Sequence, residues 1–248
     1  LLSKFTRKNV TVALSGDGGD EVFAGYPTYQ AHKMARYFPK MAYGIAKGVV
    51  NWLPVSDDNI TFDFKAKKFV SGIPYTPEIR NQIWLGSFEP FQKTKLFSAE
   101  VKKYLKGDSE FDILFRSLRD CDADNYLEKV LWLDMHFYLQ DNMLVKVDRT
   151  SMANSLEVRV PYLDHRLVEF ACGLPANMKL NGLTTKYILK KTAKEMLPND
   201  SILLADIFPL ISYSCVHLDS AFSGIAGFDK VGELILPFHL LPIHIRCG

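Results

Sequence analysis

The feature that most constrains the fold is a compact apolar run that ends in a glycine-rich, acidic turn. Residues 9–14 (NVTVAL) are apolar or β-branched apart from Asn9, which predicts a buried strand. The next residues, 15–21 (SGDGGDE), carry three glycines and predict a tight turn. A helical pattern follows, pauses at Gly25–Pro27 and resumes over Tyr29–Tyr37, with the proline suited to the first turn of the second helix. A strand that passes through such a turn into a helix indicates an α/β domain.

The rest of the chain predicts mostly helices. Helical spacing or capping is found in five stretches: Phe111–Leu118, Tyr126–Leu139, Val147–Ser155, Asp164–Cys172 and Lys186–Met196. Residues 157–161 (EVRVP) alternate, which predicts an extended segment with Glu157 and Arg159 on one side. We therefore expect an α/β domain dominated by helices, with few strands of a parallel sheet.

Composition limits the classes of partner. The 248 residues carry a formal net charge of +2 from nearly balanced acids and bases, which argues against nucleic acid or an anionic membrane as an obligatory partner. No uncharged apolar run reaches the roughly 18 residues that a membrane-spanning helix needs. The four cysteines have no CxxC spacing, so we expect reduced thiols in a cytoplasmic protein.

The character of the sequence changes after residue 200. Residues 201–248 hold six charged side chains, whereas the first 200 residues hold 52, about twice the density. Apolar residues in this tail follow neither a helical nor a strand period. We therefore expect one domain over residues 1–200 and a divergent tail over 201–248, which a shift of reading frame near residue 201 or a foreign C-terminal sequence would explain.

The turn at residues 15–21 can be interpreted in two ways. Backbone N–H groups of a glycine-rich turn before a helix suit a phosphate or nucleotide, although no Walker A or GxGxxG pattern is present. Asp17, Asp20 and Glu21 would repel phosphate unless Mg²⁺ offset their charge. A second use of these carboxylates would be to accept hydrogen bonds from ribose hydroxyls or a substrate amine. The alternative is a solvated turn whose acids cap the helix.

A further group of charged residues and a single lysine leave similar alternatives. Lys146, Asp148, Arg149, Glu157 and Arg159 alternate in sign, which suits either an internal ion network or a clamp for an acidic substrate. Lys186 in the first turn of a helix opposes the helix dipole, so it is either a surface lysine or one held there for phosphate.

Three stretches, taken together, resemble the asparagine synthetase family. They are VALSGDGGDEVFAGY at residues 12–26, MLVKVDRTSMANSLEVRVPYLDHRLVEF at 143–170, and the helix that contains Lys186 and ends in LPND. Their order and spacing also agree, and the resemblance covers residues 1–200. Each stretch alone is a weak signal, whereas the combination is highly specific.

The resemblance implies an adenine-nucleotide α-hydrolase-like synthetase domain, present here in part. Such a domain uses Mg-ATP to adenylate the side-chain carboxylate of aspartate. Ammonia, released from glutamine by a separate glutaminase domain, attacks the aspartyl-AMP and yields asparagine. The resemblance also implies a cytoplasmic protein without nucleic-acid or membrane partners, with a homodimer as one form of the full protein.

By motif, the resemblance assigns catalytic roles to Asp17, at the position associated with acyl-adenylate formation, and to Lys186, which would bind the pyrophosphate. It assigns ATP binding to four residues of the turn: Ser15, Gly16, Asp20 and Glu21. The last two would also help to hold Mg²⁺ or position the substrate amine. Candidates for the substrate or phosphate side are Lys146, Asp148 and Arg149. Glu157 and Arg159 would belong to the scaffold.

The chain also departs from the family. A pyrophosphate-binding loop of the type Ser-Gly-Gly-x-Asp-Ser is expected ahead of the turn, and neither it nor a glutaminase domain is present in the sequence. The basic residues and Gly-Phe element expected after residue 200 are missing as well. We therefore expect a fragment that is inactive alone. The alternatives to such a partial asparagine synthetase are a related amide-forming synthetase, for a β-lactam or a peptide, and a catalytically inactive fragment that only packs against partners.

Overall fold

The computed structural model describes residues 1–54, 61–86, 88–104 and 111–196. Residues 3–196 form one compact unit, and the description below concerns that unit. The predicted tail at residues 201–248 lies outside the described residues, so the predicted boundary at residue 200 stays a prediction.

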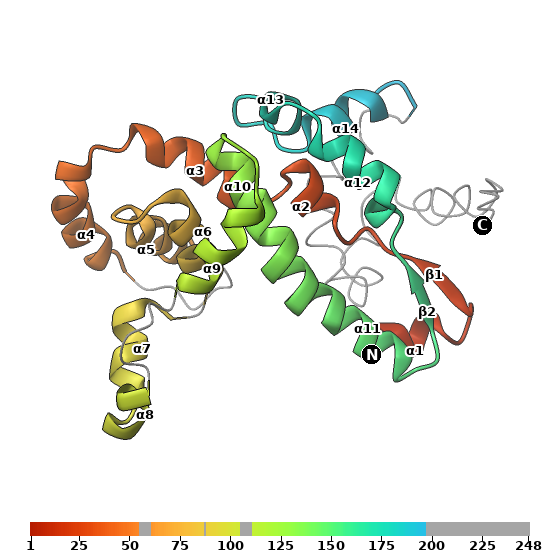
Figure 1. The fold of residues 1–248 in the computed structure, drawn as a ribbon, viewed down its shortest axis with the longest axis horizontal. Helices are drawn as coiled ribbons and strands as arrows, with labels where there is room; N and C mark the ends of the chain where they lie inside the picture. The colour runs from red at the N-terminus through yellow and green to blue at the C-terminus, as the bar shows by residue number, and fades with distance from the viewer. Residues whose placement is uncertain (55–60, 87, 105–110, 197–248) are drawn as a thin grey trace. The chain divides into compact units, whose positions relative to one another are not determined.

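The described residues are mostly helical, as the sequence predicts (Figure 1). The α-helices ahead of the long central helix are α1 (Leu2–Thr6), α2 (Gly19–Phe23), α3 (Pro27–Tyr37), α4 (Tyr43–Asn51), α5 (Phe62–Gly72), α6 (Pro77–Leu85), α7 (Pro90–Leu96), α8 (Ala99–Tyr104) and α9 (Asp112–Ser117). The central helix contains α10 (Tyr126–Leu133) and α11 (Val145–Met152). It is followed by α12 (His165–Cys172), α13 (Ala176–Lys179) and α14 (Tyr187–Ala193). Short 3₁₀ turns cover Lys40–Ala42, Leu118–Asp120 and Pro161–Leu163. None of the helices in this part of the chain is long and apolar enough to cross a membrane.

The described residues contain a two-stranded parallel sheet. Strand β1 (Val12–Leu14) pairs with β2 (Glu157–Arg159), with Val12 opposite Glu157 and Leu14 opposite Arg159. The prediction of a buried strand over residues 9–14 is wrong in two respects. The chain is still turning after α1 at Asn9, whose N–H donates to the carbonyl of Thr6, and the strand begins only at Val12. Val12 and Leu14 are 36% and 57% exposed, because no described element covers that face of the sheet.

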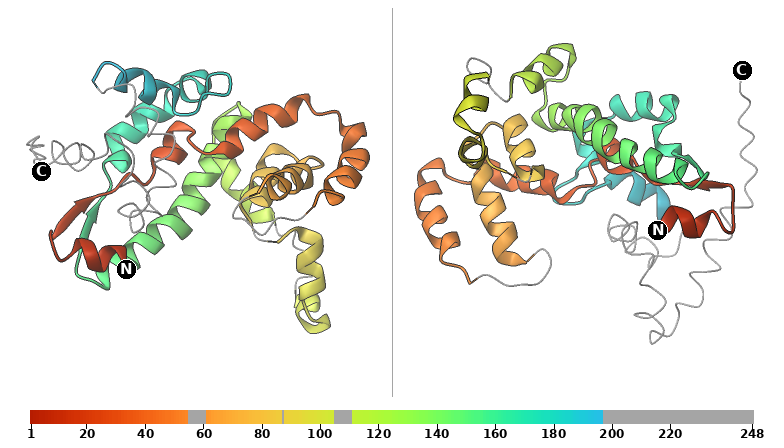
Figure 2. Two further views of the ribbon diagram at one scale, coloured as in Figure 1. Left: turned by 180° about the vertical axis from the view of Figure 1, so that it is seen from behind. Right: turned by 90° about the horizontal axis from the view of Figure 1, so that it is seen from below.

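A long helix runs through the centre of the unit, from Tyr126 to Met152 (Figure 2). Its middle part, Asp134–Leu144, is a π-helix that joins α10 to α11; we call it the π segment. The predicted break between residues 139 and 147 is wrong. A π-helix has more residues per turn than an α-helix, so the apolar period shifts and a continuous helix looks interrupted in the sequence.

Three apolar clusters surround α2 and α3. One joins Ala24 and Tyr29 to residues of α10 and to Leu180, and another packs Val22 and Phe23 against Ala171 of α12. The third packs Ala35 of α3 against Ile73 and Trp84. The two helices that follow the glycine-rich turn are therefore packed against other parts of the unit on several sides.

Candidate functional site

The glycine-rich turn leaves the sheet at Ser15, whose N–H donates to the carbonyl of Arg159 at 2.8 Å. The Ser15 hydroxyl then hydrogen-bonds the Asp17 carboxylate, which folds the turn back on itself. Gly18 has a φ of 83°, and a Cβ there would lie 2.3 Å from Cδ2 of Leu163. The left-handed backbone favours glycine at position 18, and a Cβ there would force the Leu163 side chain to move.

Helix α2 begins directly after this turn and has five residues, with Asp20 and Glu21 in its first turn. Those acids offset the partial positive charge of the helix start. A positive group that attracts an anion therefore has to come from another part of the chain.

Lys186 supplies that charge. Its Nζ lies 2.8 Å from Oδ1 of Asp20, and the two side chains are only 17% and 16% exposed. The sequence predicted Lys186 in the first turn of a helix. In the structure it lies immediately before α14, which begins at Tyr187, so this prediction is wrong by one residue. Its φ of 48° is left-handed, an uncommon conformation for lysine, and it directs the residue towards α2.

Gly25 makes room for this ion pair. A Cβ at position 25 would lie 1.8 Å from Oδ1 of Asp20 and 2.3 Å from Cε of Lys186. The preceding residue, Ala24, also has a positive φ of 56°. The elbow (Ala24–Tyr26) between α2 and α3 is thus shaped around the ion pair.

Glu21 points into the interior and is 1% exposed. The Tyr26 hydroxyl donates to its Oε1 at 2.6 Å. Burial raises the pKa of Glu21, although this hydrogen bond acts in the opposite direction. Burial, and then the neighbouring Glu21 carboxylate, raise the pKa of Tyr26, so this hydroxyl stays protonated as a donor.

These contacts do not fit a Mg²⁺ site formed by Asp20 and Glu21. Asp20 is neutralised by Lys186, and Glu21 is buried against Tyr26. Across the described residues, no three His, Cys, Asp or Glu side chains gather in a way that suits a metal ion. Asp17, half-buried in the turn, is the remaining carboxylate of the three.

The second predicted group lies on α11 and β2. Asp148 and Arg149 are exposed, and in the described part of the chain no interaction joins either of them to Asp20 or Lys186. Lys146 is half-buried, with its Nζ 3.5 Å from Sδ of Met143. Glu157 and Arg159 lie on one side of β2, as predicted, and form an exposed ion pair at 2.6 Å.

Sequence reasoning missed a polar group beside the turn, made of the half-buried Tyr26 and the fully buried Tyr29, His32, Asn81 and Asp134. The sequence carried one usable signal, a single acid within the apolar run VLWLDMHF at residues 130–137. An acid in such a run has to find buried hydrogen-bond partners.

Comparison with known proteins gives a consistent result. The family model for asparagine synthase matches residues 1–203. The chain is 28% identical over 202 residues to asparagine synthetase [glutamine-hydrolyzing] 1 of Bacillus subtilis, covering 79% of this chain and 30% of that protein. It is 31% identical over 211 residues to a putative asparagine synthetase [glutamine-hydrolyzing] of Mycobacterium bovis, covering 79% and 29%.

A third relative, asparagine synthetase [glutamine-hydrolyzing] 3 of B. subtilis, is 29% identical over 196 residues, which cover 78% of this chain and 25% of that protein. The chain thus spans less than a third of the length of these relatives. No solved structure gives a significant match.

Proposed function

Because the chain belongs to the asparagine synthase family, we propose that it forms part of the ATP site of an enzyme that amidates aspartate to asparagine. The observation that carries the proposal is the ion pair between Asp20 and Lys186. It joins two of the three stretches that resemble the family, although they lie far apart in the sequence. The proposal includes an adenine-nucleotide α-hydrolase-like fold for the complete domain, and a cytoplasmic location.

In the proposed reaction, a carboxylate oxygen of aspartate attacks the α-phosphorus of ATP, and pyrophosphate leaves. Ammonia derived from glutamine then attacks the acyl carbon of aspartyl-AMP, a proton is lost, and asparagine and AMP are formed. Adenylation is needed because a carboxylate is a poor electrophile. Negative charge gathers on phosphate oxygens in the first step, and a fixed cation stabilises it.

Lys186 is the proposed cation for the leaving pyrophosphate. In the absence of nucleotide its charge is held by Asp20, so the ammonium is already placed beside the turn when ATP arrives. Ser15, Gly16 and Asp17 would contact the nucleotide and the reacting carboxylate. Magnesium would arrive as the Mg–ATP substrate, and the proposal assigns no resident ion to Asp20 and Glu21.

The remaining parts of the site are proposed to lie outside the described residues. The relatives are roughly three times as long as the matched segment, so the glutaminase activity, the phosphate loop and a dimer belong to the proposed complete protein. We also propose that the 248-residue chain alone does not make asparagine.

A hybrid protein tests the function. Residues 1–203 replace the matching segment of B. subtilis asparagine synthetase 1, and the hybrid is incubated with ATP, Mg²⁺, aspartate and ammonium. Asparagine and AMP in equal amounts are expected. AMP release with another carboxylate substrate but not with aspartate would favour a related amide-forming synthetase, and no AMP from a folded hybrid would contradict the proposal.

A further inference from the structure

A closed set of buried hydrogen bonds joins α3 to the π segment and α6. The Tyr29 hydroxyl donates to Oδ2 of Asp134 at 2.7 Å, and Nδ2 of Asn81 donates to Oδ1 of Asp134 at 2.6 Å. Oδ1 of Asn81 lies 3.2 Å from Nε2 of His32, which returns the set to α3. All four side chains are fully buried. Because Tyr29 and His32 are three residues apart, they share one face of the helix.

The same π segment reaches the elbow at a second point. The ring of Tyr138, four residues after Asp134, packs edge-on against Tyr26 with centroids 5.7 Å apart. The ring centroid of Tyr26 also lies 5.8 Å from that of Tyr29, and the Tyr26 hydroxyl donates to the Glu21 carboxylate. Two residues of the π segment therefore contact the two tyrosines that flank the start of α3.

This arrangement is unfavourable as ordinary core packing. A buried carboxylate is costly unless it is fully hydrogen-bonded, and an apolar side chain of similar size would fill the same space without that cost. Burial raises the pKa of Asp134 to about 7, even though both hydrogen bonds favour the ionised form. What the carboxylate adds over an apolar group is direction, since its two oxygens fix Tyr29 and Asn81 at once.

We propose that Asp134 is a positioning residue for the ATP site: through Tyr29 it fixes the elbow, and the elbow holds Glu21 and the Asp20–Lys186 ion pair in place. The link is short. Tyr29 is three residues beyond Tyr26, and the ion pair occupies the space that a Cβ at Gly25 would fill. If the start of α3 is held less firmly, the elbow therefore moves, and the ion pair that packs against it moves as well.

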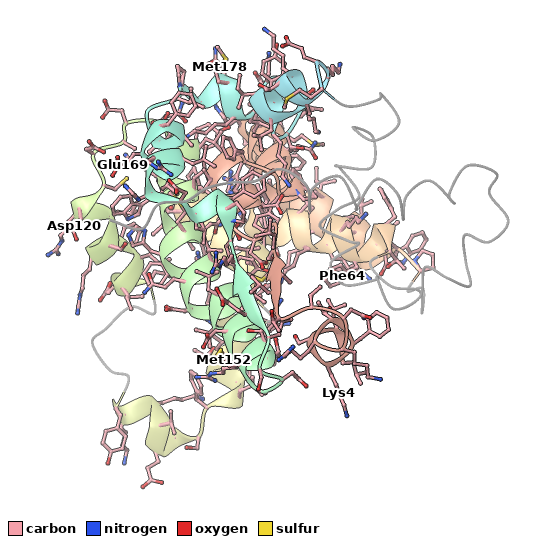
Figure 3. The ribbon with its side chains drawn as sticks, turned by 90° about the vertical axis from the view of Figure 1, so that its right-hand side faces the viewer. Lys4, Phe64, Asp120, Met152, Glu169 and Met178 are labelled. Carbon is pink, nitrogen blue, oxygen red and sulfur yellow. The ribbon has the colours of Figure 1, made fainter. Side chains whose placement is uncertain are left out.

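Hydrogen exchange of the 248-residue chain, followed by mass spectrometry, tests the proposal without requiring any ligand. Tyr29→Phe removes one hydroxyl, and Asp134→Asn removes the charge and one acceptor. Matched controls are Tyr37→Phe, an exposed tyrosine at the end of the same helix, and Asp120→Asn, which lies at the periphery in Figure 3. Should Asp134→Asn fail to fold, Tyr29→Phe carries the test alone.

Both test variants should exchange the amides of residues 19–29 about tenfold faster, since each leaves a buried polar group unsatisfied, while α5 and α12 keep their wild-type rates. The double variant should match the single ones, because both act through one link. Unchanged exchange at residues 19–29, or an equal rise throughout the chain, would overturn the proposal.

The consequence for ATP rests on the proposed function and is measured separately in the hybrid. The Michaelis constant for ATP should rise about tenfold in Tyr29→Phe at a temperature where the protein is fully folded, with Tyr37→Phe unchanged. A lower thermal midpoint with an unchanged Michaelis constant would overturn the positioning role. A wild-type hybrid that does not use ATP would contradict the proposed function and leave the exchange test in force.

Discussion

Acid titration of the buried network gives a prediction whose sign and size follow from the structure. Burial lowers the pKa of His32 from 6.5 to about 4 and raises that of Asp134 from 3.8 to about 7. Between pH 4 and 6.5 the unfolded state binds more protons at His32, so the histidine makes stability rise with pH. Over the same range the folded state binds more protons at Asp134, so the aspartate makes stability fall as pH rises.

The two effects are similar in size and largely cancel. Each pH unit changes the contribution of one group by at most about 1.4 kcal/mol, so His32 accounts for about 3 kcal/mol over its window. Replacing His32 removes its contribution to the pH dependence of stability and leaves that of Asp134. His32→Gln should therefore gain stability relative to the wild type as the pH falls from 6.5 to 4, by an amount on the order of 3 kcal/mol.

Urea unfolding followed by tryptophan fluorescence measures this, because the His32 ring lies 4.6 Å from that of Trp84. Free energies of unfolding are compared at half-unit steps from pH 4 to 7.5. His165→Gln, at an exposed histidine, is the control and should run parallel to the wild type. If the His32→Gln and wild-type curves are also parallel from pH 4 to 6.5, the conclusion that His32 is buried and neutral in the folded protein is refuted.

Three further predictions concern two glycines near the site and the residue that caps α10. Gly25→Ala should separate Asp20 from Lys186 and lower the free energy of unfolding by about 1–3 kcal/mol. Gly44→Ala is the control and should not destabilise the protein, because its Cβ would enter open space. Equal effects of the two substitutions would contradict the close packing at Gly25. Gly18→Ala should lower the thermal midpoint more than Gly182→Ala, since both have positive φ but only Gly18 meets Leu163, and the reverse order would show that strain alone matters. Asn125→Ala should lower the free energy of unfolding by about 1 kcal/mol, because Oδ1 of Asn125 accepts from the N–H of Leu127 at 2.8 Å at the start of α10. Asn125→Asp keeps an acceptor at this position and should retain most of that free energy in chemical denaturation.

Local signals predicted the parts of the fold that local chemistry determines. Pro27 begins α3, Asp164 caps α12 through the N–H of Arg166, and Glu157 and Arg159 share one side of β2. In each case the residue itself supplies the bond or the backbone geometry that forms the element. The parallel pairing of β1 with β2 brings together strands far apart in sequence, and their apolar patterns alone do not specify it.

Tertiary contacts decided the parts that were predicted wrongly or missed. The π segment hides the continuity of the central helix because its period differs from that of its neighbours. Lys186 adopts a left-handed conformation to reach Asp20, and no propensity favours that for lysine. The partners of Asp134 come from α3 and α6, so its role is visible only once those helices are packed together.

Exchange of labelled pyrophosphate into ATP by the hybrid tests most directly whether Lys186 and the turn at residues 15–18 belong to one ATP site. Lys186→Met is compared with Lys191→Met, an exposed lysine on α14. The wild-type hybrid and Lys191→Met should exchange pyrophosphate in the presence of aspartate, and Lys186→Met should lose at least about a hundredfold in rate, the effect of removing one transition-state charge partner. Exchange by Lys186→Met at the rate of Lys191→Met would contradict the assignment.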